Sequence, residues 1–117
     1  MAVLRRAYRD GVHFQSSRGV TATKYVHVCE RRLDALKELD DAGELSLRVE
    51  AAISWQDDIF PVRRRWELLG GERHYYRSAR LNANAVKFHF DGTVEPKSSY
   101  LMTPWAADST WRGKLNL

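Results

Sequence analysis

Cysteine is nearly absent from this sequence, because Cys29 is the one cysteine among 117 residues. A single thiol excludes an intrachain disulfide and a zinc site built from several cysteines. The sequence also lacks an internal repeat, a low-complexity linker and any run of about 18 apolar residues, the length typical of a membrane-spanning helix. Its first residues contain no long apolar segment of the kind found in secretory signals. We therefore predict one domain over residues 1–117, a cytoplasmic location and no membrane partner.

Several well-known functional motifs are absent as well. The sequence has no G-x-G-x-x-G, no P-loop, no G-x-S-x-G and no H-E-x-x-H, which are the usual signatures of dinucleotide binding, phosphate binding, α/β-hydrolases and zinc proteases. The net charge is +4 and the pI is near 9.5, but the 15 acidic residues are interspersed among the 19 basic ones. The one basic run, residues 63–65, is typical of a solvated helix face. We therefore predict no nucleic-acid partner.

Apolar periodicity predicts alternating helices and strands. With 44% hydrophobic residues, the chain has enough apolar side chains to build a core. Leu33, Leu36 and Leu39 share one face of a predicted helix, and Gly43 follows where a helix end favours a residue with positive φ. The predicted elements, in chain order, are a helix over Val3–Ser17, a strand over Val20–Val28, a helix over Glu30–Ala42, a strand over Leu45–Ile53, a helix from Asp57 to Leu69, a helical segment over Glu72–Leu81, a strand over Ala85–Phe90 and a long loop over Gly92–Leu117.

This order of elements predicts an α/β fold made of parallel βαβ units with right-handed crossovers. Three strands make a poor domain by themselves, because a parallel sheet needs helices over its faces and neighbours at its edges. We therefore predict part of a larger fold, a partial (β/α)8, TIM-like barrel. A small flavodoxin-like sheet is the competing architecture, although that fold normally has about five strands. The uncovered sheet edges of such a part predict self-association.

The strand predicted over Ala85–Phe90 carries the strongest candidate functional residues. An apolar and a polar set of side chains alternate along this stretch and its end: Val86, Phe88 and Phe90, and Lys87, His89 and Asp91. In parallel sheets and barrels, functional groups gather at the carboxyl ends of strands. If the apolar set packs on the helices, the polar set faces the interior of a barrel. A buried ammonium is costly unless it is paired or chemically changed, so we single out Lys87 as a functional candidate.

Other interpretations of the same residues stay open. On an edge strand, Lys87 and His89 would face water. A lone histidine is more often a hydrogen-bonded structural residue than a ligand. His27 and Cys29 also lie at a predicted strand end, and a thiol between a strand and a helix can be reactive. A nucleophilic role for Cys29 would need a base, which its neighbouring sequence does not supply.

Short motifs follow one another between residues 18 and 105: RGVTA at Arg18–Ala22, LDALKEL at Leu33–Leu39, GELSLRV at Gly43–Val49, VKFHFDGT at Val86–Thr93 and LMTPW at Leu101–Trp105. In this order they resemble the amidohydrolase superfamily. Within it, they are similar to amidohydrolase family 3, which includes N-substituted formamide deformylase-like enzymes.

The resemblance implies a (β/α)8 barrel that hydrolyses amide- or formamide-type C–N bonds of small molecules with a metal-activated water. It implies a divalent metal, zinc, in the full-length parent. Lys87 occupies the place of a strand-end lysine that several relatives carboxylate and use to bridge two metals. Lys87 is thus the expected metal ligand, and Asp91 is the expected catalytic residue, which orients the turn or contacts the substrate.

The sequence also departs from the family pattern. No two of its histidines are two residues apart, so the first-strand His-x-His metal pair is missing, and so are the later-strand histidines and the final-strand aspartate. Trp105 stands where the family usually has tyrosine. We therefore expect a fragment of a barrel that is inactive by itself. The alternatives are a small basic α/β binding or interaction module without catalysis, and an unrelated α/β enzyme that uses Lys87 or Cys29.

Overall fold

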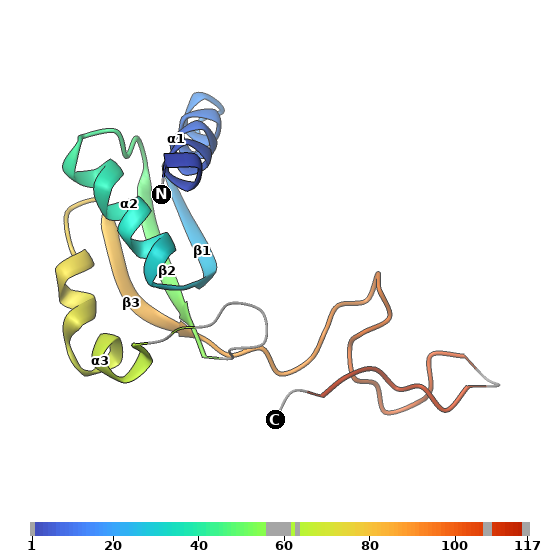
Figure 1. The fold of residues 1–117 in the computed structure, drawn as a ribbon. Helices are drawn as coiled ribbons and strands as arrows, with labels where there is room; N and C mark the ends of the chain where they lie inside the picture. Colours follow the sequence, from blue (N-terminus) through green and yellow to red (C-terminus); the bar gives the residue numbers. More distant parts are fainter. Residues whose placement is uncertain (1, 56–61, 63, 107–108, 116–117) are drawn as a thin grey trace. The chain divides into compact units, whose positions relative to one another are not determined.

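The computed structural model describes residues 2–55, 62, 64–106 and 109–115. The chain divides into two compact units, Met1–Lys87 and Phe88–Leu117. The helices and strands formed by the described residues all belong to the first unit (Figure 1). They are α1 (Ala2–Ser17), β1 (Ala22–Val28), α2 (Glu30–Asp41), β2 (Arg48–Ser54), α3 (Arg65–Gly70), the 3-10 helix η1 (Glu72–Tyr76) and β3 (Leu81–Lys87). Within the described residues, no helix has the length and apolar character needed to cross a membrane.

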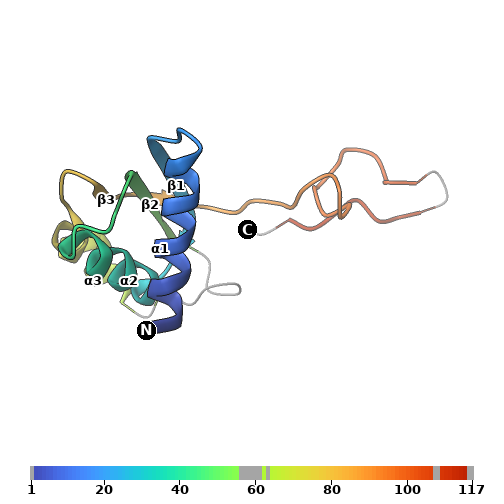
Figure 2. The ribbon, with the colours of Figure 1, turned by 90° about the horizontal axis from the view of Figure 1, so that it is seen from above.

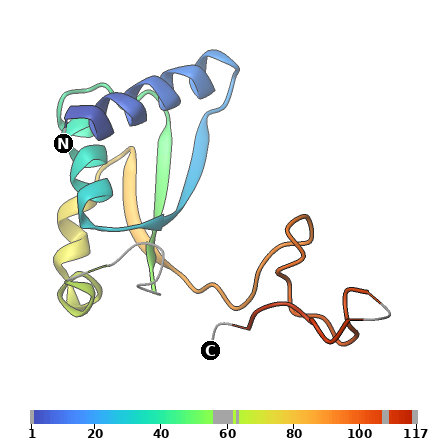
Figure 3. The same ribbon diagram turned by 45° about the vertical axis from the view of Figure 1, so that its right-hand side comes forward.

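The strands form one parallel sheet in the order β1-β2-β3. Each strand therefore pairs with the next one in the sequence, which confirms the predicted parallel βαβ units. Figure 2 shows α2 and α3 on the same side of the sheet, and Figure 3 shows α1 running across the amino-terminal ends of the strands. A flavodoxin-like sheet has its first strand between the second and the third, so the observed order differs from the competing prediction. Closure into a barrel stays a prediction.

α2 forms where the sequence predicts it, because leucines recur along one of its faces. Those buried side chains are Leu33, Leu36 and Leu39, each 0% exposed. Leu33 and Leu36 belong to the same hydrophobic core as Ile53 of β2. The helix ends just before Gly43, whose φ of 70° is a backbone conformation that glycine adopts without strain. The predicted end signal is therefore confirmed.

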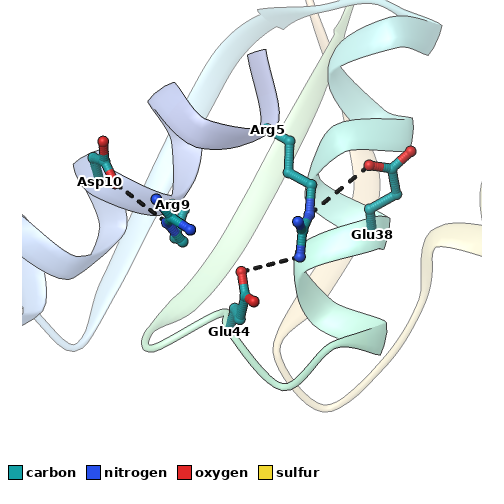
Figure 4. Close-up of polar contacts among 5 residues, drawn as sticks. All are labelled: Arg5, Arg9, Asp10, Glu38 and Glu44. Atoms are coloured by element: carbon teal, nitrogen blue, oxygen red, sulfur yellow. Dashed lines mark hydrogen bonds and ion pairs between the residues drawn. The ribbon is translucent and has the colours of Figure 1, made fainter. Parts of the chain in front are cut away.

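The contacts that join α1 to the rest of the first unit include one buried side chain and a pair of ionic contacts. Val12 is the buried residue of α1. Arg5 lies between Glu38 of α2 and Glu44 of the following loop, with N–O distances of 3.9 and 3.1 Å (Figure 4). The Arg5 side chain is 34% exposed, and ion pairs of this kind contribute about 0–1 kcal/mol. Burial of Val12, at about 1.5–3 kcal/mol for a side chain of its class, therefore outweighs the ion pairs.

β3 begins and ends earlier than the sequence predicts. The strand covers Leu81–Lys87 and not Ala85–Phe90, and the helical segment before it is limited to Glu72–Tyr76. Ser78 is the physical reason, because its hydroxyl oxygen accepts the backbone N–H groups of Arg80 and of the first β3 residue at 3.0 and 2.9 Å. This local turn satisfies N–H groups that a continuing helix would have used. β1 and β2 also begin slightly later than predicted.

The apolar residues after β3 do not pack on the helices as predicted. Phe88 and Phe90 are 45% and 61% exposed, and both lie in the second unit, where their rings stack at a centroid distance of 6.2 Å. In α3, which forms part of the third predicted helix, Trp66 is 70% exposed and Leu68 is buried. The predicted start of that helix near Asp57 lies outside the described residues.

The described residues of the second unit form a loop, as predicted, and hydrogen bonds join its two halves. The backbone N–H of Leu101 donates to the carbonyl oxygen of Arg112 at 2.7 Å, and that of Trp105 donates to Trp111 at 3.0 Å. The indole N–H of Trp111 donates to the carbonyl oxygen of Lys97 at 2.9 Å. These hydrogen bonds hold the loop together, although its described residues form no helix or strand.

Candidate functional site

Lys87 is the last residue of β3 and lies beside the end of β2. The register pairs Lys87 with Ser54, and pairs the residue before Lys87 with Ile53. Ile53 belongs to the core that includes leucines of α2, and successive side chains of a strand point to opposite faces. Ser54 and Lys87 therefore lie on the face turned away from α2. Lys87 is half-buried, and its role as a metal ligand stays a prediction.

β1 ends in a bulge that is strained at His27. The register between β1 and β2 shifts between Tyr25 and Val28, and His27 has a φ of 58°. A residue with a side chain in this left-handed region costs roughly 1–2 kcal/mol. The bulge brings the imidazole to β2, where Nδ1 lies 3.3 Å from the Ser54 hydroxyl oxygen. Bulges commonly re-aim a side chain next to functional sites.

Ser54 links the ends of all three strands. It is 1% exposed and is the one buried polar side chain among the residues that the structure describes. It contacts His27 of β1 and pairs in register with Lys87 of β3. These three residues, which we call the strand-end cluster, share the carboxyl-terminal edge of the sheet, where parallel folds place their functional groups.

Sequence reasoning identified Lys87 but singled out neither Ser54 nor its contact with His27. The strand ends that hold both residues are recognisable in the sequence, but no local spacing connects position 27 with position 54. The register of β1 against β2, including its shift before Val28, brings the two side chains together. A polar residue directly after the apolar run of residues 51–53 was the available signal.

β3 does not carry His89 and Asp91, because both follow the strand and belong to the second unit. The carboxylate of Asp91 accepts the backbone N–H of Tyr100 at 3.0 Å. This contact joins the beginning of the loop to its middle. The catalytic role expected for Asp91 stays a prediction.

The described residues do not complete a metal site by themselves. They contain no group of three or more His, Cys, Asp or Glu side chains that could hold an ion. A lysine ammonium offers no acceptor, so Lys87 would become an oxygen ligand only after carboxylation. The expected zinc therefore rests on the family resemblance.

The chemistry available to the strand-end cluster is hydrogen bonding and positive charge. The His27 imidazole, in contact with the buried Ser54 hydroxyl, and the half-buried Lys87 ammonium are groups that suit the carbonyl or carboxylate oxygen of a small polar ligand. Cys29 lies two residues after His27 but packs against the hydrophobic core. The cluster therefore does not include the thiol.

The strain at His27 predicts that glycine is more stable than alanine at this position, the reverse of their usual order in a strand. Both His27→Gly and His27→Ala remove the imidazole, but only glycine relieves the positive φ. In an ordinary strand, glycine is less stable than alanine by roughly 0.5–1 kcal/mol. Here we expect His27→Gly to be more stable than His27→Ala by about 1 kcal/mol, measured by urea denaturation. Equal stability, or a more stable alanine variant, would show that the bulge is not strained.

No protein-family model, curated protein or solved structure matches this chain. The fold and the geometry of the strand-end cluster are therefore the observations from which a function is inferred.

Proposed function

We propose that this chain is part of a (β/α)8 barrel of the amidohydrolase type, and that the whole barrel hydrolyses amide- or formamide-type C–N bonds of small molecules. One observation carries the proposal: Lys87 ends β3 on the sheet face turned away from α2. In a barrel this face is the interior, and the carboxyl-terminal edge holds the active site. The position of Lys87 therefore suits the metal-ligand role expected for it.

The strand order supports a barrel over a doubly wound sheet. In a barrel, each strand lies beside the one before it, and the helices cover the outside. A doubly wound sheet reverses its order at a switch point and places helices on both faces. The order β1-β2-β3, with α2 and α3 on one side of the sheet (Figure 2), follows the barrel pattern.

Each candidate residue has a proposed role. Lys87 would become an oxygen ligand if its deprotonated amine added carbon dioxide, which forms an N–C bond and releases a proton; the resulting carbamate anion removes the cost of an enclosed ammonium. His27, held by the buried Ser54 hydroxyl, hydrogen-bonds a substrate oxygen at the same edge, and Asp91 orients the turn after β3. A divalent metal, zinc by resemblance, would supply an activated water. Its remaining ligands would come from strands other than β1, β2 and β3.

A small basic binding module without catalysis is the second candidate. A cavity at the amino-terminal edge of the sheet, lined in part by Arg48 and Arg80, favours it. The two candidates depend on different residues, because hydrolysis requires Lys87 and anion binding requires the arginines.

The purified 117-residue chain is expected to be inactive, because its described residues do not complete a metal site. With zinc added, amine release from N-formyl and N-acyl amines should not exceed the rate in buffer. The chain should also bind the dye ANS and self-associate with rising concentration, since α2 and α3 lie on the same side of the sheet (Figure 2) and β1 and β3 are its outer strands. Turnover by the chain alone, or a dilute monomer with dispersed amide NMR signals and no dye binding, would refute the proposal.

A further inference from the structure

A cavity of about 470 Å³ lies at the amino-terminal edge of the sheet, the edge opposite to the strand-end cluster. This volume falls within the roughly 300–1,000 Å³ of small-molecule sites. Its lining includes Thr21, Arg48 and Arg80, which lie at the starts of the three strands. The backbone N–H of Arg48 donates to the Thr21 carbonyl oxygen at 3.1 Å, and that of Val49 donates to the Arg80 carbonyl oxygen at 2.7 Å. The two arginines are therefore neighbours across the sheet.

The lining of this cavity is positively charged. Arg48 and Arg80 contribute two guanidinium groups, and no Asp or Glu lines the cavity. Two glutamates lie close in sequence to the β2 residues of the lining. Glu44 pairs with Arg5 at 3.1 Å, and Glu50 is not part of the lining. The local charge therefore favours an anionic ligand.

The carboxyl end of α1 opposes this charge, but only partly. Ser16 of α1 lies in the lining, and a helix end carries about half a negative charge. The last carbonyl groups are already satisfied, because the Ser16 oxygen accepts the Gly19 N–H at 3.0 Å and the Gln15 oxygen accepts the Val20 N–H at 3.1 Å. Two full positive charges outweigh this partial negative charge.

The hydrogen-bond donors that remain for a ligand belong mainly to the arginines. The Ser46 hydroxyl donates to the Val12 carbonyl oxygen at 3.2 Å, and the Ser16 hydroxyl lies 3.0 Å from Ser46 Oγ. Arg80 uses Nη1 to donate to the Leu45 carbonyl oxygen at 2.9 Å, which leaves four of its five N–H groups. Within the described part of the chain, the Arg48 side chain makes no hydrogen bond or ion pair.

We propose that this cavity binds the phosphate group of a small molecule between the guanidinium groups of Arg48 and Arg80. The planar donor fork of arginine matches the oxygens of a phosphate and holds them by two parallel hydrogen bonds. This proposal does not depend on the barrel or on hydrolysis, because it uses the opposite edge of the sheet.

A 31P NMR titration of inorganic phosphate with the 117-residue chain tests this site. The method observes the ligand, so self-association of the protein does not prevent it. At constant ionic strength, we expect saturable line broadening with a dissociation constant on the order of 1 mM. Arg48→Met should weaken binding about tenfold, the effect of one lost charge-assisted hydrogen bond. The matched control is Arg31→Met, which removes an exposed arginine of α2 outside the cavity and should leave binding unchanged.

A second variant keeps the test decisive if Arg48→Met alters folding. Arg80→Lys retains the charge and a donor for the Leu45 carbonyl oxygen, but it loses the donor fork, so we expect affinity to fall severalfold with normal thermal unfolding. The site would be overturned if the phosphate line broadening disappeared when sodium chloride supplied the same ionic strength. Equal phosphate affinities for Arg48→Met and Arg31→Met would also overturn it. Acetate binding as tight as phosphate binding would overturn the phosphate assignment.

Discussion

Lys87→Ala, in the longer polypeptide that the proposed barrel requires, is expected to lower kcat/KM for N-formyl and N-acyl amines by about a hundredfold or more. The loss of one preorganised electrostatic group in an active site typically has an effect of this size. Lys87 is well placed for such a role, because it ends β3 in register with the buried Ser54. Initial-rate kinetics with both substrate classes measure the effect.

Lys97→Ala is the matched control, because Lys97 is an exposed lysine of the second unit. It should leave kcat/KM near the wild-type value. Lys87 is only half-buried, so neither substitution should change the free energy of unfolding by more than about 0.5–1 kcal/mol. Near wild-type turnover by the Lys87→Ala enzyme would end the hydrolase proposal. The basic binding module would then be the better interpretation.

Tyr76→Phe is expected to lower the free energy of unfolding of the first unit by about 1.5–3 kcal/mol, the range for a hydrogen bond to a charged group. The Tyr76 hydroxyl donates to Asp34 Oδ1 at 2.8 Å, and Tyr76 is 8% exposed. This contact fixes η1 against α2. The matched control is Tyr75→Phe, because Tyr75 is 65% exposed. Urea denaturation should separate the two variants clearly.

Tyr76 also predicts that the free energy of unfolding depends on pH above neutrality. Burial, followed by the hydrogen bond to Asp34, raises the pKa of Tyr76 well above its ordinary value of 10.0. The folded state therefore holds this proton more tightly than the unfolded state. Its contribution to stability is complete below about pH 10 and is lost as the pH rises through the folded-state pKa.

In Tyr76→Phe, the unfolding free energy should therefore fall less steeply between about pH 10 and 11 than in the wild type. A shallower slope will remain, because burial also raises the pKa values of Tyr8 and Tyr25. Tyr75→Phe should keep the wild-type slope. Equal slopes for Tyr76→Phe and the wild type would show that the buried hydroxyl does not control alkaline unfolding.

Local patterns predicted the elements whose signals lie within one segment. The leucine face of α2 and the following Gly43 defined that helix nearly to the residue. The segment before β3 was mispredicted, because the hydroxyl of Ser78 closes a turn that apolar periodicity does not reveal. Phe88 and Phe90 are exposed for a similar reason. The alternation of apolar and polar residues in the sequence continues to Phe90, but strand pairing stops at Lys87.

The sequence by itself determined the alternation of helices and strands, the buried leucine face of α2 and the place of Lys87 in the third strand. Tertiary structure alone decided that His27, Ser54 and Lys87 share one edge and that Arg48 and Arg80 share the other. The reason is that local patterns depend on neighbours within a few residues. Strand register joins residues that are dozens of positions apart, and packing of the whole sheet sets that register.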